Sequence, residues 1–134
     1  MKNEIKILIV EDEILIADFI YNMLLKEGFT KVETVNDVQS ALIKFKTFQP
    51  EIILMDINVE GQNTGIKLAT QKNVQAKVIY ITAQNDDETI QKAIATNPET
   101  YLTKPIKKFD LLAAIQLTTY RKAKKIHHNK RRLR

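Results

Sequence analysis

The chain has 134 residues, of which 44% are hydrophobic and 28% are charged, and it has no cysteine. A chain of this length buries one substantial core but not two ordinary ones, and the lack of cysteine excludes disulfides, thiolate metal sites and thiol nucleophiles. The first apolar run is too short for a signal peptide or a membrane span. We therefore expect a single cytoplasmic domain without membrane contact.

The positive charge is confined to the carboxyl terminus. The formal net charge is +5, but residues 1–120 hold all sixteen acids and thirteen of the 21 Lys and Arg, a net of −3. Residues 121–134 carry the other eight basic residues and no acid. We interpret residues 1–120 as the folded domain and residues 121–134 as a basic helix extension or linker.

The first predicted strand, residues 5–10, leads into a segment with helical periodicity. Gly28 can adopt the left-handed conformation that ends such a helix. The apolar residues of this helix fall on one stripe, as expected when one face is buried: Ile16, Phe19, Ile20, Met23 and Leu24.

Strands and helices continue to alternate along the chain. Further strands are predicted at residues 31–35, 51–56, 77–82 and 100–103. Further helices are predicted at residues 38–48, 64–72, 87–96 and 108–126. The fourth helix should end at Asn97, which tolerates the left-handed cap, and Pro98 prevents it from continuing.

The predicted strands point to a parallel sheet. Three of them are almost wholly apolar, which is typical of strands buried on both faces. Five strand–helix repeats predict the flavodoxin-like α/β class: a doubly wound five-stranded parallel sheet of order 2-1-3-4-5, with five helices, in three α/β/α layers. In such sheets the functional site lies at the carboxyl ends of the strands.

The predicted strand ends carry five residues capable of chemistry: Glu11 and Asp12, Asp56, Thr82 and Lys104. Crowded carboxylates without cysteine or histidine suit Mg²⁺, with Mn²⁺ as a substitute. A carboxylate such as Asp56 can form an acyl-phosphate. Lys104 and Thr82 could then bind two phosphoryl oxygens. This pattern predicts a phosphoryl-transfer site.

Four segments, KILIVEDE, ILMDINVEG, VIYITA and YLTKPI, resemble the signatures of the receiver domain of two-component response regulators, over about residues 4–120. The resemblance makes Asp56 the phosphoacceptor. It also makes Asp12 and Asp56 magnesium ligands, with Glu11 acting through water and the backbone carbonyl of Asn58 completing the protein ligands.

The same resemblance assigns a conformational switch. Thr82 and Tyr101 match the pair in which the hydroxyl moves toward the phosphoryl group and the ring turns inward. Lys104 matches the lysine of the family's site, and its bond to Pro105 resembles one that is cis. Ala83 leaves access to the phosphoryl group. Asn58 and Gln84 match positions that tune the phosphate lifetime.

Two departures from the family pattern stand out. Glu11 occupies a position where many members have aspartate, which should preserve metal binding but alter its water structure. The loop at residues 58–65, NVEGQNTG, lacks the proline that is common there. The family pattern therefore does not define the conformation of this loop or the partner surface that it offers.

By resemblance, the phosphoryl group comes from a sensor histidine kinase or a phosphotransfer protein. The domain is a signalling switch and not an enzyme, beyond self-phosphorylation from phosphodonors and self-dephosphorylation. Its output would act on a downstream protein or on an effector domain absent from this sequence. Homodimers would form through the fourth helix, fifth strand and fifth helix.

For the basic tail we rank a helix extension first, a linker second and a nucleic-acid contact third, because it lacks aromatic interleaving and a helix-turn-helix pattern. His127 and His128 have no carboxylate or thiol nearby in sequence. We therefore expect them to be solvated and not to form a metal site.

Three other functions are weighed against the receiver. A haloacid-dehalogenase-like phosphatase needs an aspartate two residues after the nucleophile, where this chain has Asn58. An FMN carrier needs a neutral phosphate-binding first loop, which here is acidic. A pseudo-receiver, which takes no phosphate, would be expected to have lost one of the site residues.

Overall fold

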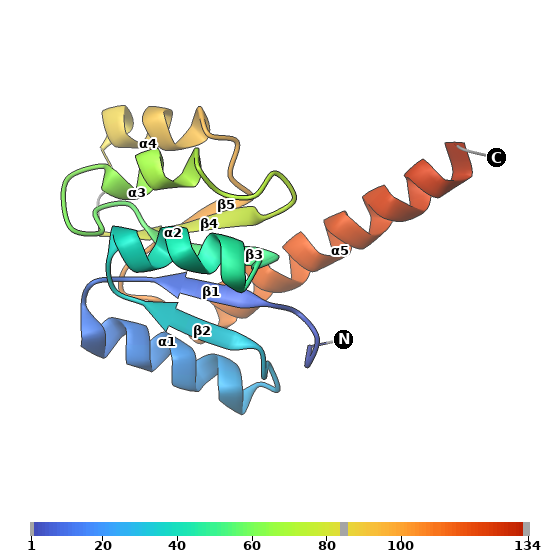
Figure 1. The fold of residues 1–134 in the computed structure, drawn as a ribbon, viewed down its shortest axis with the longest axis horizontal. Coiled ribbons are helices and arrows are strands. Elements are labelled where there is room, and N and C mark those ends of the chain that lie inside the picture. Colours follow the sequence, from blue (N-terminus) through green and yellow to red (C-terminus); the bar gives the residue numbers. More distant parts are fainter. Residues whose placement is uncertain (1, 84–85, 133–134) are drawn as a thin grey trace.

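The computed structural model describes residues 2–83 and 86–132, with side chains through residue 125. Five parallel strands form one sheet in the order β2-β1-β3-β4-β5, as predicted (Figure 1). The strands are β1 (Ile7–Val10), β2 (Val32–Val35), β3 (Ile52–Asp56), β4 (Lys77–Thr82) and β5 (Thr100–Thr103). The helices are α1 (Ile14–Lys26), α2 (Val38–Thr47), α3 (Thr64–Ala69), α4 (Asp87–Ile94) and α5 (Lys108–Arg132).

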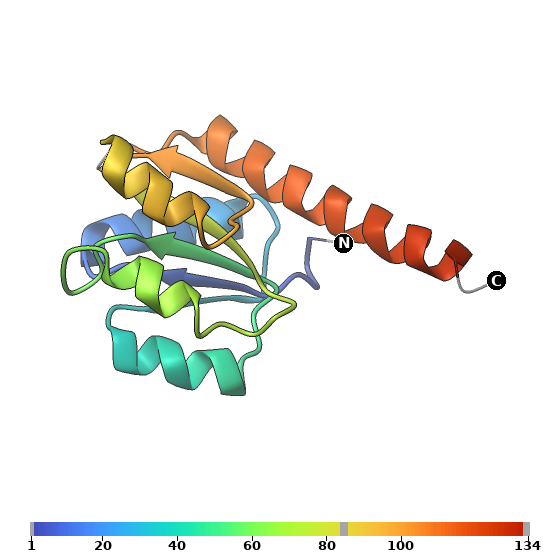
Figure 2. The same ribbon diagram turned by 90° about the horizontal axis from the view of Figure 1, so that it is seen from above.

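Helices cover both faces of the sheet, because successive strand side chains point to opposite faces. Leu8, Ile53 and Tyr80 belong to the core beneath α2, α3 and α4. Their neighbours Ile9 and Leu54 belong to the core beneath α1 and α5. Figures 1 and 2 show the resulting three layers, so the predicted doubly wound α/β/α architecture is confirmed.

The largest differences in helix length from the prediction are in α3 and α5, while α2 and α4 end one and two residues early. α3 ends at Ala69 instead of residue 72, because the next three amides bond to carbonyls three residues back, as Thr70 does to Lys67, in tighter turns. α5 continues beyond the predicted end to Arg132. The helical backbone thus covers most of the basic tail, while the side chains of His127 and His128 lie outside the described residues.

One residue of the first helix is placed differently from the prediction. Phe19 is 54% exposed, although Ile20 and Leu24 of the same predicted stripe are buried. Ala17 takes the buried position on that face. The apolar stripe is wider than the face that contacts the sheet, so its margin remains in solvent.

Three local backbone features agree with the sequence analysis. Gly28 has a φ of 100° and Asn97 a φ of 56°, the left-handed conformations expected after α1 and α4. The Lys104–Pro105 peptide bond is cis.

Within the described part of the chain, no helix combines the length and apolar character needed to cross a membrane.

α5 packs on the sheet with its first half and then projects away from the body (Figure 2). Arg121 Nη1 lies 3.2 Å from Glu99 Oε2, just before β5, and Lys122 Nζ lies 4.0 Å from Glu51 Oε2, just before β3. These contacts lie at the amino ends of the strands. The basic segment therefore leaves the domain at the edge of the sheet opposite Asp56.

Gly65, in the first turn of α3, lies against the end of β3. Its N–H donates to the Ile57 carbonyl at 2.7 Å. A β-carbon at this position would lie 2.0 Å from the Asp56 carbonyl oxygen and 2.9 Å from Ile57 Cα. Because both obstacles are backbone atoms, only glycine allows α3 to approach the strand that carries Asp56.

We predict that Gly65→Ala destabilises the protein by about 3 kcal/mol or more, because α3 must move away from β3. Urea unfolding, with the midpoint compared at an unchanged m value, measures this. Gly61→Ala is the matched control, because its β-carbon would lie 3.0 Å from the Thr64 hydroxyl, which can move. This variant should lose much less stability. Equal losses in both variants would contradict the packing argument.

Candidate functional site

The strand register places the predicted site residues at one edge of the sheet. Val10 pairs with Met55, so Glu11 follows β1 beside Asp56 at the end of β3. Asp56 pairs with Ile81, which places Thr82 one residue beyond it on β4. Thr82 in turn pairs with Thr103, immediately before Lys104. Parallel pairing thus brings together residues that are more than ninety positions apart.

Three carboxylates form the centre of the site. One oxygen from each of Glu11, Asp12 and Asp56 lies within 4.8 Å of the others. Glu11 and Asp56 are only 2% and 6% exposed, while Asp12 is exposed. Two negative charges out of water and a third beside them repel one another strongly. This cluster could therefore hold a compensating cation.

Lys104 supplies part of that compensation. Its ammonium nitrogen lies 2.7 Å from Glu11 Oε1, 3.7 Å from Asp56 Oδ2 and 3.9 Å from Glu13 Oε1. Its backbone N–H donates to the Thr82 carbonyl at 2.9 Å, which holds the lysine beside the end of β4. One ammonium thus faces three carboxylates and cannot neutralise them all.

The charge imbalance appears in two pKa values. Burial raises the pKa of Glu11 to about 7, with a further rise from the Asp56 charge, although hydrogen bonds from Lys104 and the Glu13 N–H oppose the shift. Burial alone would lower the pKa of Lys104, but the hydrogen bond to Glu11 and the Asp56 charge outweigh it and raise that pKa. Both groups therefore hold their protons more tightly than they would in water.

The donor set fits a small divalent cation. Octahedral Mg²⁺ binds oxygen at about 2.0–2.1 Å, so its ligands lie about 2.9 to 4.2 Å apart, close to the 4.8 Å limit of the cluster. Within the described residues this group contains no nitrogen or sulfur ligand. Hard oxygen donors of this kind suit Mg²⁺ or Mn²⁺.

Asn58 lies directly beside the nucleophile candidate. Its N–H donates to Asp56 Oδ1 at 3.1 Å, and its side-chain oxygen accepts from the Asn63 N–H at 2.9 Å. Its backbone carbonyl accepts from the Gly61 N–H at 3.2 Å and keeps a second lone pair. The predicted carbonyl ligand remains a prediction.

The predicted switch pair lies on two adjacent strands. Thr82 is fully buried, and Tyr101 is half-buried against the core beneath α2, α3 and α4. Burial, followed by the charge of Asp86, raises the pKa of Tyr101. Ala83 is exposed, as access to the site requires, whereas Gln84 lies outside the described residues.

Glu60 is a site residue that sequence reasoning missed. Its N–H donates to Asp12 Oδ2 at 2.8 Å, and its Oε1 accepts from the Val38 N–H at 2.5 Å. The missing proline of this loop was a signal that could have pointed to it, because proline has no N–H to give Asp12.

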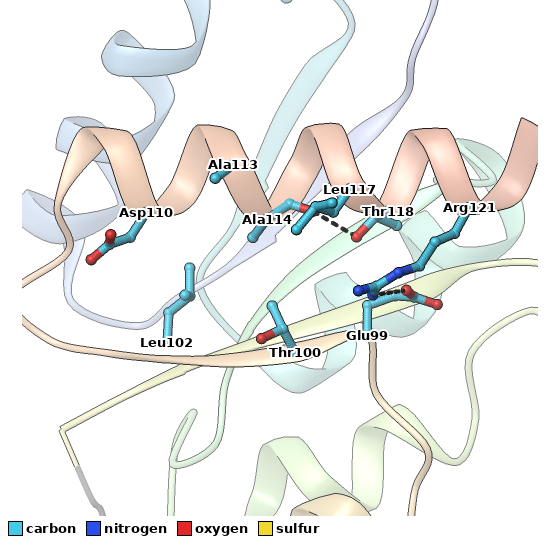
Figure 3. A pocket seen from close by; sticks show the side chains of 9 residues that line it. All are labelled: Glu99, Thr100, Leu102, Asp110, Ala113, Ala114, Leu117, Thr118 and Arg121. Carbon is cyan, nitrogen blue, oxygen red and sulfur yellow. Dashed lines mark hydrogen bonds and ion pairs between the residues drawn. The ribbon is translucent and has the colours of Figure 1, made fainter.

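A separate hollow of 250 Å³ lies between β5 and α5, away from the carboxylates (Figure 3). Small side chains on α5, Ala113 and Ala114, face Leu102 across it, and the ion pair between Arg121 and Glu99 closes one end. It contains no member of the acidic cluster. This hollow is therefore separate from the cluster of Glu11, Asp12 and Asp56.

Comparison with known proteins identifies the class. The model of the response regulator receiver domain matches residues 7–116, so the chain belongs to this family. The confirmed strand order and the cluster of acids agree with that assignment.

Individual relatives show the same relationship. The chain is 29% identical over 115 residues to the chemotaxis protein CheY of Bacillus subtilis, covering 84% of this chain and 96% of that protein. It is 29% identical over 119 residues to the transcriptional regulatory protein PdtaR of Mycobacterium tuberculosis, covering 87% of this chain and 57% of that protein. The chain thus spans little more than half of that regulator, and about half of several other curated relatives.

Solved structures share the fold. A CheY-like receiver domain from Methanospirillum hungatei superposes with a TM-score of 0.83 at 25% identity, covering 90% of this chain and 98% of that one. The receiver domain of a modulated diguanylate cyclase from Desulfovibrio desulfuricans superposes with a TM-score of 0.81 at 29% identity, covering 90% of this chain and 97% of that one.

The Glu11 pKa predicts a pH dependence of stability. In metal-free protein, folded Glu11 keeps its proton up to about pH 7, while the unfolded residue loses it near 4.5. The folded state therefore binds more protons in this window, and the free energy of unfolding falls as pH rises, by at most about 1.4 kcal/mol per pH unit. Urea unfolding in EDTA between these pH values measures the slope.

Glu11→Gln removes this titration. The free energy of unfolding of this variant should therefore change less with pH over the same window. Glu33→Gln, which removes an exposed acid paired with Lys44, should keep the wild-type slope. Parallel profiles for wild type and Glu11→Gln would show that Glu11 titrates at its ordinary value.

Proposed function

We propose that this receiver domain accepts a phosphoryl group on Asp56 in a reaction that depends on Mg²⁺. The observation that carries the proposal is the buried Asp56 carboxylate, with Glu11 and Asp12 beside it and the Lys104 ammonium 3.7 Å away. An acid buried among other acids is costly unless the site serves to bind a cation and react.

In the proposed reaction an Asp56 carboxylate oxygen attacks the phosphorus of a phosphohistidine. The bond between phosphorus and the imidazole nitrogen breaks, and the imidazole leaves with its electron pair. Bound Mg²⁺ neutralises charge on the phosphoryl oxygens. Asp12, Asp56, Glu11 through water and the Asn58 carbonyl would hold the ion.

Two other side chains would bind the transferred group. Lys104 would move from Glu11 toward a phosphoryl oxygen, a short shift because it already lies between the carboxylates. The Thr82 hydroxyl would donate to another oxygen. Tyr101, on the neighbouring strand, would then turn inward and carry the change to the surface of β5.

The donor is proposed to be a sensor histidine kinase or a phosphotransfer protein in the cytoplasm. Beyond self-phosphorylation from small phosphodonors and self-dephosphorylation, the domain would catalyse nothing. We propose that residues 1–120 form the switch and that residues 121–134 extend it toward a downstream protein or an effector domain.

We predict that acetyl phosphate with Mg²⁺ adds one phosphoryl group to the protein, and that beryllofluoride binds the same site. Intact-mass spectrometry detects the covalent adduct. Asp56→Asn and treatment with EDTA should each abolish it, because they remove the nucleophile and the cation. Asp18→Asn, which removes an exposed acid of α1, is the control and should react normally.

Two results would reject this prediction. Wild type without an adduct would support a pseudo-receiver, and an adduct that persists in Asp56→Asn would place the phosphate on another residue.

A phosphorylation-dependent homodimer through α4, β5 and α5 is the second part of the proposal. This surface carries exposed apolar residues, with Ile94, Leu117 and Tyr120 between 51% and 62% exposed. Leu117 lies on the rim of the β5–α5 hollow (Figure 3). Exposed apolar side chains beside a hollow are typical of a contact surface.

We predict that beryllofluoride shifts the protein from monomer to dimer in sedimentation velocity, and that Leu117→Glu prevents the shift by burying an unpaired charge. Phe19→Glu is the matched control, because Phe19 on α1 is 54% exposed and Leu117 is 51% exposed. If Phe19→Glu alone prevents the shift, the dimer uses the α1 surface instead.

A further inference from the structure

The loop at residues 58–63 joins two other loops of the site through Glu60. On one side the Glu60 N–H donates to Asp12 Oδ2 at 2.8 Å, across 48 positions of sequence. On the other side Glu60 Oε1 accepts from the Val38 N–H at 2.5 Å. A single residue thus contacts a metal-ligand candidate and the first residue of α2.

The backbone of Glu60 adopts an uncommon conformation to make these contacts. Its φ is 61°, in the left-handed region that non-glycine residues rarely occupy. Such a conformation is unfavourable for a residue with a side chain and persists only where surrounding contacts hold it. Proline, with φ fixed near −65° and no N–H, could make neither the turn nor the bond to Asp12.

The side chain of Glu60 completes the cap of α2. Asp37 caps this helix by accepting from the Ser40 N–H at 2.7 Å, which leaves other first-turn amides without an intrahelical partner. Glu60 accepts from one of them, at Val38, and its negative charge favours the positive end of the helix dipole. α2 is therefore capped in part by the loop that follows Asp56.

We propose that Glu60 is a positioning residue that links cation binding at Asp12 to the amino terminus of α2. This inference rests on the proposed Mg²⁺ site. The Glu60 N–H occupies a lone pair of Asp12 Oδ2 and so restrains the orientation of the carboxylate. If Asp12 shifted on binding a cation, Glu60 would follow through this bond, and its carboxylate would transmit the movement to Val38.

The link offers a route to a surface distant from Tyr101. α2 packs on the same face of the sheet as α3 and α4, and it contacts that face through Ala41 and Phe45. A change in its first turn alters the β2–α2 loop, where Asn36 Nδ2 also donates to the Glu11 carbonyl at 2.9 Å. On either side of Asp37, Asn36 thus bonds to the Glu11 backbone carbonyl and Val38 bonds to the Glu60 carboxylate.

The test separates the backbone contact from the side-chain contact. Glu60→Gly keeps φ near 61° accessible and keeps the N–H for Asp12, but it removes the acceptor for Val38. Glu60→Gln retains a side-chain oxygen and is the matched control. Amide NMR spectra are recorded during an Mg²⁺ titration of each protein without phosphodonor.

In wild type and Glu60→Gln, the Val38 amide should shift in proportion to Mg²⁺ saturation. In Glu60→Gly the chemical shift of the Val38 amide should not follow Mg²⁺ saturation, although that of the Asn58 amide still should. Glu60→Pro, which loses both contacts, should bind Mg²⁺ roughly 10-fold more weakly. If Glu60→Pro does not fold, Glu60→Gly alone decides.

The outcomes distinguish this inference from the function on which it rests. A wild-type protein without a saturable Mg²⁺ response would overturn both. A normal Asn58 response together with a wild-type Val38 shift in Glu60→Gly would overturn the link alone.

Discussion

Repulsion among three carboxylates is the constraint on which the site depends. Parallel pairing fixes Glu11 beside Asp56, because Val10 pairs with Met55 at the ends of two strands whose apolar residues are all buried. Lys104 offsets part of that repulsion, while burial and, to a smaller extent, the charge of Asp56 raise the pKa of Glu11. In the proposed function, a divalent cation and a phosphoryl group would change this balance of charge and so act as signals.

The same charges organise the loops around the site. The Asp12 carboxylate accepts from the Glu60 N–H, the Glu11 carboxylate accepts from the Glu13 N–H, and the Asp56 carboxylate accepts from the Asn58 N–H. Each acid therefore serves twice, as a ligand candidate and as an acceptor that fixes a turn. A new charge at Asp56 must then be felt in several loops at once, which is the property that a conformational switch requires.

Much of this arrangement could be predicted from sequence because it depends on local patterns. Apolar β-branched runs identify buried strands, and the topology of parallel sheets then places Asp56, Thr82 and Lys104 together. The role of Glu60 could not be predicted in this way, since it depends on a left-handed backbone and on partners 22 and 48 positions away. The exposure of Phe19 likewise depends on how much of α1 the sheet can cover.

α5 connects the two ends of the sheet. It begins at Lys108, shortly after the lysine of the site, and runs along β5 to Arg121 and Lys122, which contact Glu99 and Glu51 at the opposite edge. The basic extension therefore lies a full strand length from Asp56 and cannot respond to the phosphoryl group through direct charge attraction, since ionic screening limits such attraction to about 8–10 Å. The packing of β5 against α5, where small side chains leave a hollow, is the contact that lies between the site and the tail.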